Sequence, residues 1–125
     1  MRGSQQDLPV AIELPDGSAI RVAEWGGMAV ELGSFTNGTD PAPLYAGLPD
    51  DRCQCPHWGY VIKGQIQFNF ADRTEIFTAG DVYHVGPGHL PVLIDGAEWV
   101  EFSPIAPYQS TMEVVGQNMQ SLGIG

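Results

Sequence analysis

Stretches in which apolar and polar residues alternate recur along most of the chain, separated by Gly, Pro or Asp-Gly. The clearest is the stretch 65–70, where glutamine or asparagine alternates with isoleucine or phenylalanine. Because successive side chains of a strand point to opposite faces, this pattern predicts a half-buried strand. Similar stretches elsewhere predict about nine short strands joined by tight turns, which indicates an all-β domain.

The chain is predicted to be a single domain, residues 1–125, because no linker, charge run or internal repeat divides it. We expect four consecutive parts: N-terminal strands at 8–36, a loop at 37–52, a core of strands at 53–104 and a C-terminal helix at about 110–122. Prolines in the loop block regular strand pairing, and irregular stretches of this length are often functional.

The tail of the chain departs from the two-residue period. Apolar residues from Met112 to Leu122 recur at intervals of three and four, which predicts one face of an amphipathic helix. Ser110 followed by Glu113 has the pattern of a capping box, which would place the start of the helix at Ser110. We expect this helix to cover an open end or edge of a β-barrel and to have a packing role.

Composition supports short strands and limits the kinds of partner. The chain contains 16 Gly and 10 Pro, and its 15 acidic and 5 basic residues give a net charge of −10. So few cations cannot neutralise a row of phosphates, which argues against nucleic acids and anionic membranes as partners. No apolar run is long enough to span a bilayer and no secretory signal is visible, so a cytoplasmic location is expected.

The candidate chemistry is concentrated in the segment CQCPH at 53–57. Alternate residues of a strand share a face, so both cysteines and the histidine are expected on one side of the sheet. In a straight strand, however, the first and last of them would be about 13 Å apart. Metal ligands lie only about 2.0–2.3 Å from their ion, so a metal site requires the chain to bend, and Pro56 is well placed to bend it.

A fourth ligand is expected from His89, which follows a Gly-Pro-Gly turn at 86–88. The predicted metal ligands are therefore Cys53, Cys55, His57 and His89. Two thiolates and two imidazoles suit zinc before other divalent ions. We expect His57 and His89 to bind the metal in either case. As an alternative to four ligands, one of the two cysteines lies outside the coordination shell.

Other roles for these residues stay open. The cysteines could form a disulfide, although i, i+2 geometry is poor for one, or could be small buried hydrophobic residues. A cysteine nucleophile with His57 as its base is a further alternative, without an evident third group to orient the base. Glu101 is a candidate inward-pointing general base, with a solvent-facing or hydrogen-bonded role as the alternative. Trp58 and Tyr60 are expected on the opposite face from His57, in packing or at an oligomer interface.

The sequence YVIKG at 60–64 resembles the end of the first motif of the cupin superfamily, an aliphatic pair followed by glycine. Seven residues before this glycine, where cupins carry an acidic metal ligand, the chain has His57. The two histidines of the cupin H-x-H pair fall at Asp51 and Cys53. Cys55 has no counterpart in that register, although CQC can also be aligned with the H-x-H pair across a shortened loop.

The second cupin motif, in which Gly-Asp is followed by P-x-G and a histidine, resembles the stretch from Gly80 onward. The proline comes one position late, at Pro87, and Pro91 occupies the histidine position. His89 lies two residues earlier, and a shift of two keeps a side chain on the same strand face. The resemblance spans roughly 46–104 and implies a cupin (jelly-roll) β-barrel with a short C-terminal α-helix.

The run 47–60 is similar to a small bacterial cupin subgroup with a Cys-x-Cys-Pro-His signature. This resemblance implies a metal site and leaves the substrate open. One divalent metal ion is expected, with zinc favoured by the donor set, and the wider resemblance to cupin barrels implies a homodimer. The replaced ligands argue against an ordinary iron or manganese oxygenase. We expect an isomerase, lyase, hydrolase or rearrangement enzyme that acts on a small polar metabolite by Lewis-acid and proton-transfer chemistry. The alternative is a non-catalytic small-molecule-binding or sensor cupin with a structural metal.

Overall fold

The computed structural model describes residues 1–36, 40–94 and 96–123. Within them the strands form a six-stranded sheet in the order β1-β2-β3-β9-β4-β7 and a three-stranded sheet in the order β6-β5-β8. The elements are β1 Val10–Glu13, β2 Ala19–Trp25, β3 Met28–Ser34, η1 Ala42–Tyr45, η2 Pro49–Asp51, β4 His57–Lys63, β5 Gln65–Asn69, β6 Thr74–Thr78, β7 Val82–Val85, β8 Leu90–Leu93, β9 Glu98–Pro104 and α1 Ile105–Ser121. The predicted all-β domain with a C-terminal helix is confirmed.

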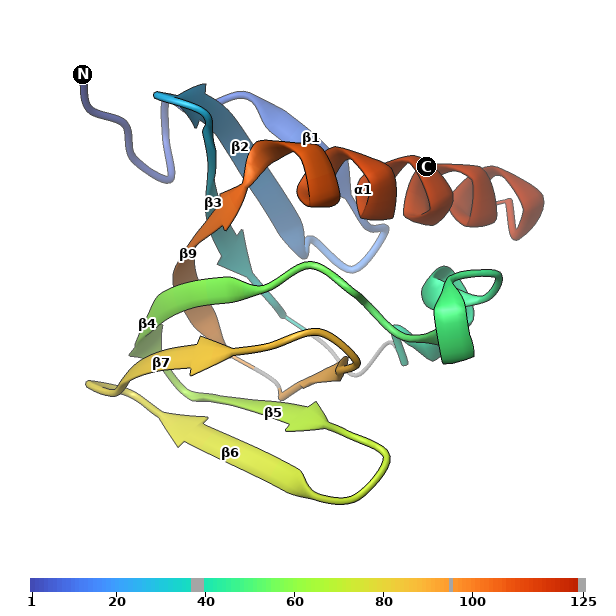
Figure 1. Ribbon diagram of the computed structural model, residues 1–125. Helices are drawn as coiled ribbons and strands as arrows, with labels where there is room; N and C mark the ends of the chain where they lie inside the picture. Colours follow the sequence, from blue (N-terminus) through green and yellow to red (C-terminus); the bar gives the residue numbers. More distant parts are fainter. Residues whose placement is uncertain (37–39, 95, 124–125) are drawn as a thin grey trace.

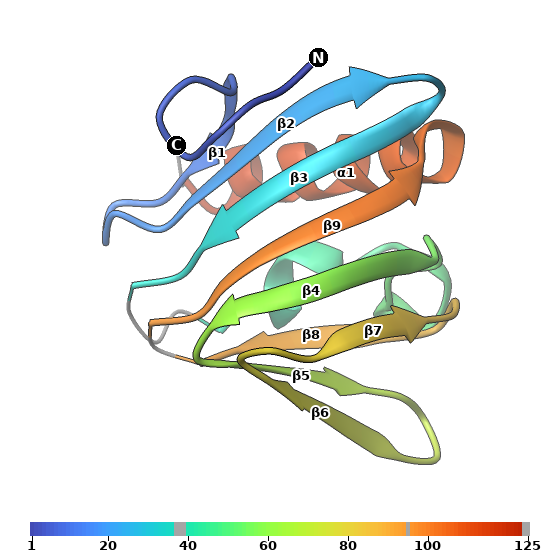
Figure 2. The ribbon, with the colours of Figure 1, turned by 90° about the vertical axis from the view of Figure 1, so that its left-hand side faces the viewer.

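The smaller sheet and the helix cover different parts of the inner face of the larger sheet (Figure 1). The smaller sheet lies against the β4 and β7 end, and α1 lies behind β1, β2 and β3 (Figure 2). In the described part of the chain no pairing closes the two sheets into a continuous barrel. The predicted barrel is therefore an open jelly roll, whose wide side is covered by the helix.

A hydrophobic core joins the two sheets at their narrow side. Ile66 and Phe68 of β5 pack there against buried side chains of the larger sheet, among them Val61 and Trp99. The alternation that predicted the strand at 65–70 accounts for this contact, because Ile66 and Phe68 share one face. A second cluster of buried residues, with Cys53, Cys55 and Tyr108, lies under the helix.

The start of the helix differs from its prediction. It begins at Ile105, directly after β9, and Pro104 occupies the N-cap position without a capping side chain. The predicted capping box is therefore wrong: the Ser110 hydroxyl donates to the carbonyl of Ala106 inside the helix, at 3.2 Å. The predicted start at Ser110 therefore misses the first five residues of the helix, because the apolar spacing is evident only from Met112 onward. None of the described helices is long and apolar enough to cross a membrane.

The predicted loop at 37–52 contains two short helical turns, η1 and η2. Residues 37–39 of that loop lie outside the described residues. The Asn118 amide of α1 donates to the carbonyls of Leu44 and Ala46, at 2.7 and 2.8 Å. These hydrogen bonds hold η1 against α1, so the loop forms part of the wall around the interior of the jelly roll.

Candidate metal centre

Cys53 and His89 are brought together by backbone pairing ahead of β4 and β8. The two residues form an isolated antiparallel bridge, in which the Cys53 amide donates to the His89 carbonyl at 2.8 Å. Strand β4 then begins at His57, after Pro56. Cys53 and His57 therefore do not lie in one straight strand, and Sγ of Cys53 is 3.7 Å from Nε2 of His57. The predicted bend in the segment 53–57 is confirmed.

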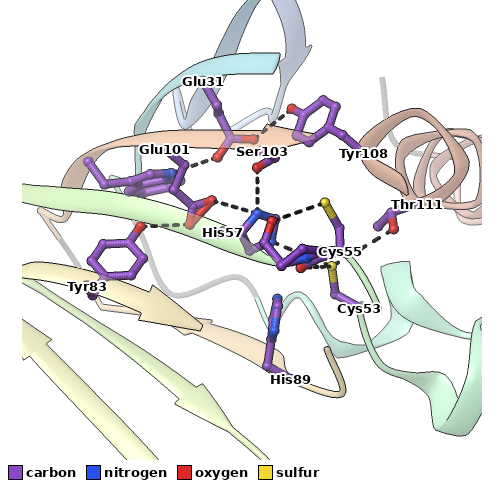
Figure 3. A network of polar contacts seen from close by, with 12 residues as sticks. Glu31, Cys53, Cys55, His57, Tyr83, His89, Glu101, Ser103, Tyr108 and Thr111 are labelled. Atoms are coloured by element: carbon purple, nitrogen blue, oxygen red, sulfur yellow. Dashed lines mark hydrogen bonds and ion pairs between the residues drawn. The ribbon is translucent and has the colours of Figure 1, made fainter. Parts of the chain in front are cut away.

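The bend places three potential ligand atoms in one group. Sγ of Cys53 and one ring nitrogen from each of His57 and His89 lie within 4.8 Å of one another, and all three residues are buried. Cys55 is buried as well, but it does not belong to this group. Its thiol donates to the carbonyl of Pro56 at 3.4 Å. The structure thus brings together three of the four predicted ligands (Figure 3), while metal binding by any of them stays a prediction.

Each imidazole is oriented through its Nδ1 atom. His57 Nδ1 is 2.7 Å from the Ser103 hydroxyl oxygen, which leaves Nε2 facing Cys53. His89 Nδ1 donates to the carbonyl of Gly86 at 2.7 Å, because a carbonyl can only accept. Nε2 of His89 is therefore the unprotonated nitrogen, and it is buried without a hydrogen-bond partner. Such an orphaned acceptor is costly, and a metal ion is a partner that would satisfy it.

The spacing and protonation of the group also suit a metal ion. Two ligands at zinc–sulfur and zinc–nitrogen distances from one tetrahedral ion would be about 3.5 Å apart, close to the 3.7 Å between Cys53 and His57. Burial lowers the pKa of both His57 and His89 to about 4, so both rings are neutral at pH 7 and offer lone pairs. Burial raises the pKa of the Cys53 thiol to about 11, so metal binding would release its proton.

A pair of buried carboxyl groups lies beside the candidate ligands. Glu31 of β3 and Glu101 of β9 are directly opposite in the sheet register, and both are buried. Trp99 Nε1 and the Tyr108 hydroxyl donate to Glu31, each at 2.8 Å, and the Tyr83 hydroxyl donates to Glu101 at 2.7 Å. Glu101 is thus buried and hydrogen-bonded, which excludes the solvent-facing alternative, and its role as a general base stays a prediction.

The two carboxyl groups can hold a proton at neutral pH. Burial, together with the charge of Glu101, raises the pKa of Glu31 to about 7. Burial likewise raises the pKa of Glu101 to about 7, although the hydrogen bond from Tyr83 lowers it. Because two adjacent buried carboxylates repel each other, the pair favours the state that shares one proton. Oε1 of Glu101 lies 3.8 Å from His57 Nδ1.

Several residues of this network were missed at the level of sequence, notably Glu31, Ser103 and Tyr108. For Glu31 a signal was present: the alternation in 28–35 puts this acidic residue on the same face as Ala29 and Gly33, two small residues. A lone carboxylate on an inward strand face is unusual and indicates a buried partner. Nothing local identifies Ser103 or Tyr108, because their partners lie far away in the sequence.

A cavity of about 100 Å³ adjoins the group and includes the candidate ligands and both glutamates in its lining. The rest of the lining is mostly apolar and comes from both sheets, η1 and α1. This composition does not favour the small polar metabolite expected from the sequence, because substrate hydroxyl groups would leave water without gaining partners over most of the wall. The sequence could not reveal the lining, since its residues come from elements far apart in the chain.

Comparison with known proteins identifies the fold. No protein-family model matches the chain, and no curated protein matches it. Solved structures do: an RmlC-like cupin from Shewanella frigidimarina is 17% identical with a TM-score of 0.56, over 83% of this chain and 90% of that one. KdgF from Halomonas sp. is 14% identical with a TM-score of 0.55, over 85% and 96%. HppE in its Fe(II) form is 12% identical with a TM-score of 0.56, over 82% of this chain and 59% of the other.

These similarities establish that the chain has the cupin fold, as the sequence predicted. At identities this low they show the fold alone. The narrower resemblance to a subgroup with the Cys-x-Cys-Pro-His signature stays a prediction. What the site can do must therefore be argued from its own residues.

Proposed function

We propose that the protein is a metal-dependent enzyme in which Cys53, His57 and His89 hold one divalent ion, with zinc as the expected metal. The observation that carries this proposal is the orphaned Nε2 of His89, buried within a group of three potential ligand atoms. A thiolate with two imidazoles is a donor set that zinc favours. The Fe(II) form of HppE supports the idea that this fold accommodates a divalent metal.

An open coordination position distinguishes catalytic from structural metal sites. Three ligands from this chain, at the wall of a cavity, leave a position for water or substrate. A bound divalent ion would supply Lewis-acid chemistry, by polarising a substrate oxygen or lowering the pKa of bound water. Isomerase, lyase, hydrolase and rearrangement reactions all use such chemistry.

The protein's own side chains would orient the site and hold a proton. Ser103 fixes the His57 ring through Nδ1 and so directs Nε2 toward Cys53. Glu101 would accept or return a proton at its carboxylate oxygens, with Glu31 as the partner that shares it. Tyr83 and Tyr108 keep the two carboxyl groups in place by donating to them.

A non-catalytic small-molecule-binding or sensor protein is the second candidate. It is favoured by Cys55, which is buried in the lining of the same cavity. If a movement of Cys55 made it the fourth ligand, the metal would be saturated and structural. Substitution of Cys55 therefore separates the two candidates, because only the sensor needs this thiol to retain the ion.

Metal analysis of the purified protein tests the proposal. We expect one zinc ion per chain in the wild type and in His84→Ala, since His84 lies on the outer face of β7, where it stacks on Trp58. We expect none in His89→Ala. Zinc-free wild-type protein that also fails to take up added zinc, iron or manganese would refute the proposal. Retention of the ion in His89→Ala would show that the binding lies elsewhere, and its loss in His84→Ala as well would show that the effect is not specific to the proposed ligands.

We further propose a homodimer formed by the outer face of the larger sheet, the uncovered side in Figure 2. Exposed apolar side chains gather on β4, β7 and β9 of this face: Trp58 (45% exposed), Tyr60 (41%), Val82 (78%) and Phe102 (41%). Copies with a net charge of −10 repel each other, and this patch of uncharged side chains is where a second copy can approach at least cost. The cytoplasmic location stays an expectation from the sequence.

A further inference from the structure

We propose that the cavity beside the candidate metal centre takes a ligand with an apolar body and a single polar head group. For the head group, the inference rests on the proposed function, because this group would bind the metal ion held by Cys53, His57 and His89. The apolar side chains of the cavity itself favour the apolar body. Sugars and polyols, which carry hydroxyl groups along their whole length, would be poor ligands for this site.

Polar and apolar side chains occupy different parts of the cavity lining. Candidate ligands and carboxyl groups gather in one cluster, as Figure 3 shows. Over the remainder, apolar side chains predominate, among them Ile20, Leu44, Ile66, Phe68, Met112 and Val115. A hydroxyl group placed against such side chains loses its hydrogen bonds to water and gains none, whereas a methylene group gains from leaving water.

The charges around the cavity also limit the ligand to a single polar group. No Lys or Arg occurs in the lining that the structure describes, so an anionic group away from the metal would have no cationic partner. Glu31 and Glu101 on the same wall add negative charge to the surroundings. A carboxylate or phosphate could therefore be accepted only at the metal, which limits the ligand to one such group.

The cavity is small and its wall is held in place. Its volume of about 100 Å³ corresponds to roughly seven to ten atoms of the size of a water molecule. Leu44 belongs to η1, and the backbone of this helix is held by the Asn118 side chain. Because the wall is already formed, the ligand's affinity should depend on how well its apolar part fills the space.

A series of primary alcohols from ethanol to 1-hexanol tests the proposal, with glycerol as the polar comparison. The reporter is the methionine methyl group in protein labelled with ¹³C at that position, followed by NMR during titration. Met112 lines the cavity, whereas Met28 lies outside the lining and serves as the internal control. We expect saturable shifts at Met112 alone, an affinity that rises about fourfold per methylene, and no shift with glycerol.

Variants of two adjacent valines on α1 locate the binding. Val115 lines the cavity and Val114 does not. We expect Val115→Phe to lower the affinity for 1-hexanol at least tenfold and Val114→Phe to leave it unchanged. If Val115→Phe does not fold, Leu44→Phe fills the same cavity from η1 and should have the same effect. Unchanged affinity in the folded cavity-filling variant would overturn the proposal.

Titration of zinc-loaded and metal-free protein separates this inference from the proposed function. If zinc does not bind but the alcohols still show the chain-length dependence at Met112, the metal proposal fails and the apolar cavity stands. If zinc binds but affinity does not rise with chain length, or glycerol binds as well as 1-hexanol, the inference is overturned while the metal proposal survives.

Discussion

The inner and outer faces of the larger sheet can be compared residue by residue, because neighbours along a strand point to opposite sides. On β4, His57 is buried and Trp58 is 45% exposed; on β9, Glu101 is buried and Phe102 is 41% exposed. Antiparallel sheets usually have the reverse arrangement, with apolar residues inside and polar residues in water. Buried ionisable groups reduce stability unless they are paired, so their presence on the inner face indicates a functional requirement.

The comparison also shows how the polar inner face is stabilised. Both carboxyl groups accept hydrogen bonds from aromatic side chains, and His57 is bonded to Ser103. His89 differs, because one of its ring nitrogens has no partner among the described residues. Among the described polar groups around the candidate site, Nε2 of His89 is therefore the one left without a partner, at the point where the proposed ion would bind.

Cys53→Ala should have the largest effect of these substitutions, a loss of zinc affinity at the candidate site. The substitution removes the only thiolate of the proposed three-ligand set, and we expect the affinity for zinc to fall more than 100-fold. Because the pKa of Cys53 is raised to about 11, zinc binding must displace a proton, and the wild-type affinity should rise about tenfold per pH unit between pH 7 and 9. Competition with a chromophoric chelator measures both, and a pH-independent affinity would exclude Cys53 as a ligand.

Ser103→Ala should also lower the affinity for zinc, but by less than Cys53→Ala. The alanine leaves His57 Nδ1 without its bond to the hydroxyl group, so the ring loses its orientation. Losses of such outer partners typically cost 10- to 100-fold in metal affinity. Ser110→Ala is the matched control, because Ser110 is an exposed helix residue. Equal affinities for the two variants would show that Ser103 does not orient a ligand.

Glu31→Gln should change how stability depends on pH in the metal-free protein. The pKa of Glu31 is raised from 4.5 to about 7, so its contribution to stability is present below pH 4.5 and is lost as the pH rises through 7. His57 and His89, with pKa values lowered to about 4, act oppositely: their contribution is present above pH 6.5 and is lost as the pH falls through 4. The variant loses the Glu31 contribution and retains those of Glu101 and the two histidines.

Urea unfolding of the two proteins at pH 5 and pH 8 measures this difference. We expect the free energy of unfolding of Glu31→Gln to increase relative to wild type by on the order of 2 kcal/mol between these pH values. A difference that does not vary with pH would mean that Glu31 is not a buried carboxyl group whose pKa is raised.

Val82→Lys should leave the inner face unchanged and affect only the outer one. Val82 is 78% exposed on the edge strand β7, so the lysine should alter the stability of the monomer by about 0.5 kcal/mol or less. We expect the variant to be monomeric by light scattering, with wild-type zinc affinity. A wild-type protein that is itself monomeric at micromolar concentration would contradict the proposed dimer.

Much of the fold could be predicted because it depends on local patterns. Alternation located the strand of Ile66 and Phe68, and the chemistry of the residues drew attention to Cys53, His57 and His89. The start of the helix was missed because a favourable capping pattern at Ser110 competes weakly with the apolar contacts of the preceding turns.

The rest of the site depends on contacts between distant parts of the chain. Tyr108 and Glu31 are 77 positions apart, and no property of either residue alone predicts their hydrogen bond. The separation of Cys55 from the other three candidates is likewise a result of the bend at Pro56, whose direction the sequence does not specify. The apolar cavity is formed in the same way, by side chains from both sheets, η1 and α1.

The proposed chemistry depends on a three-ligand metal site that opens into the cavity. Anomalous diffraction at the zinc edge, from crystals of the wild type and of Cys55→Ser, tests it most directly. We expect one anomalous peak in both proteins, bonded to Cys53, His57 and His89, with no sulfur of Cys55 in the coordination shell. A peak bonded to all four residues in the wild type and absent from Cys55→Ser, or no peak at this position in either protein, would contradict it.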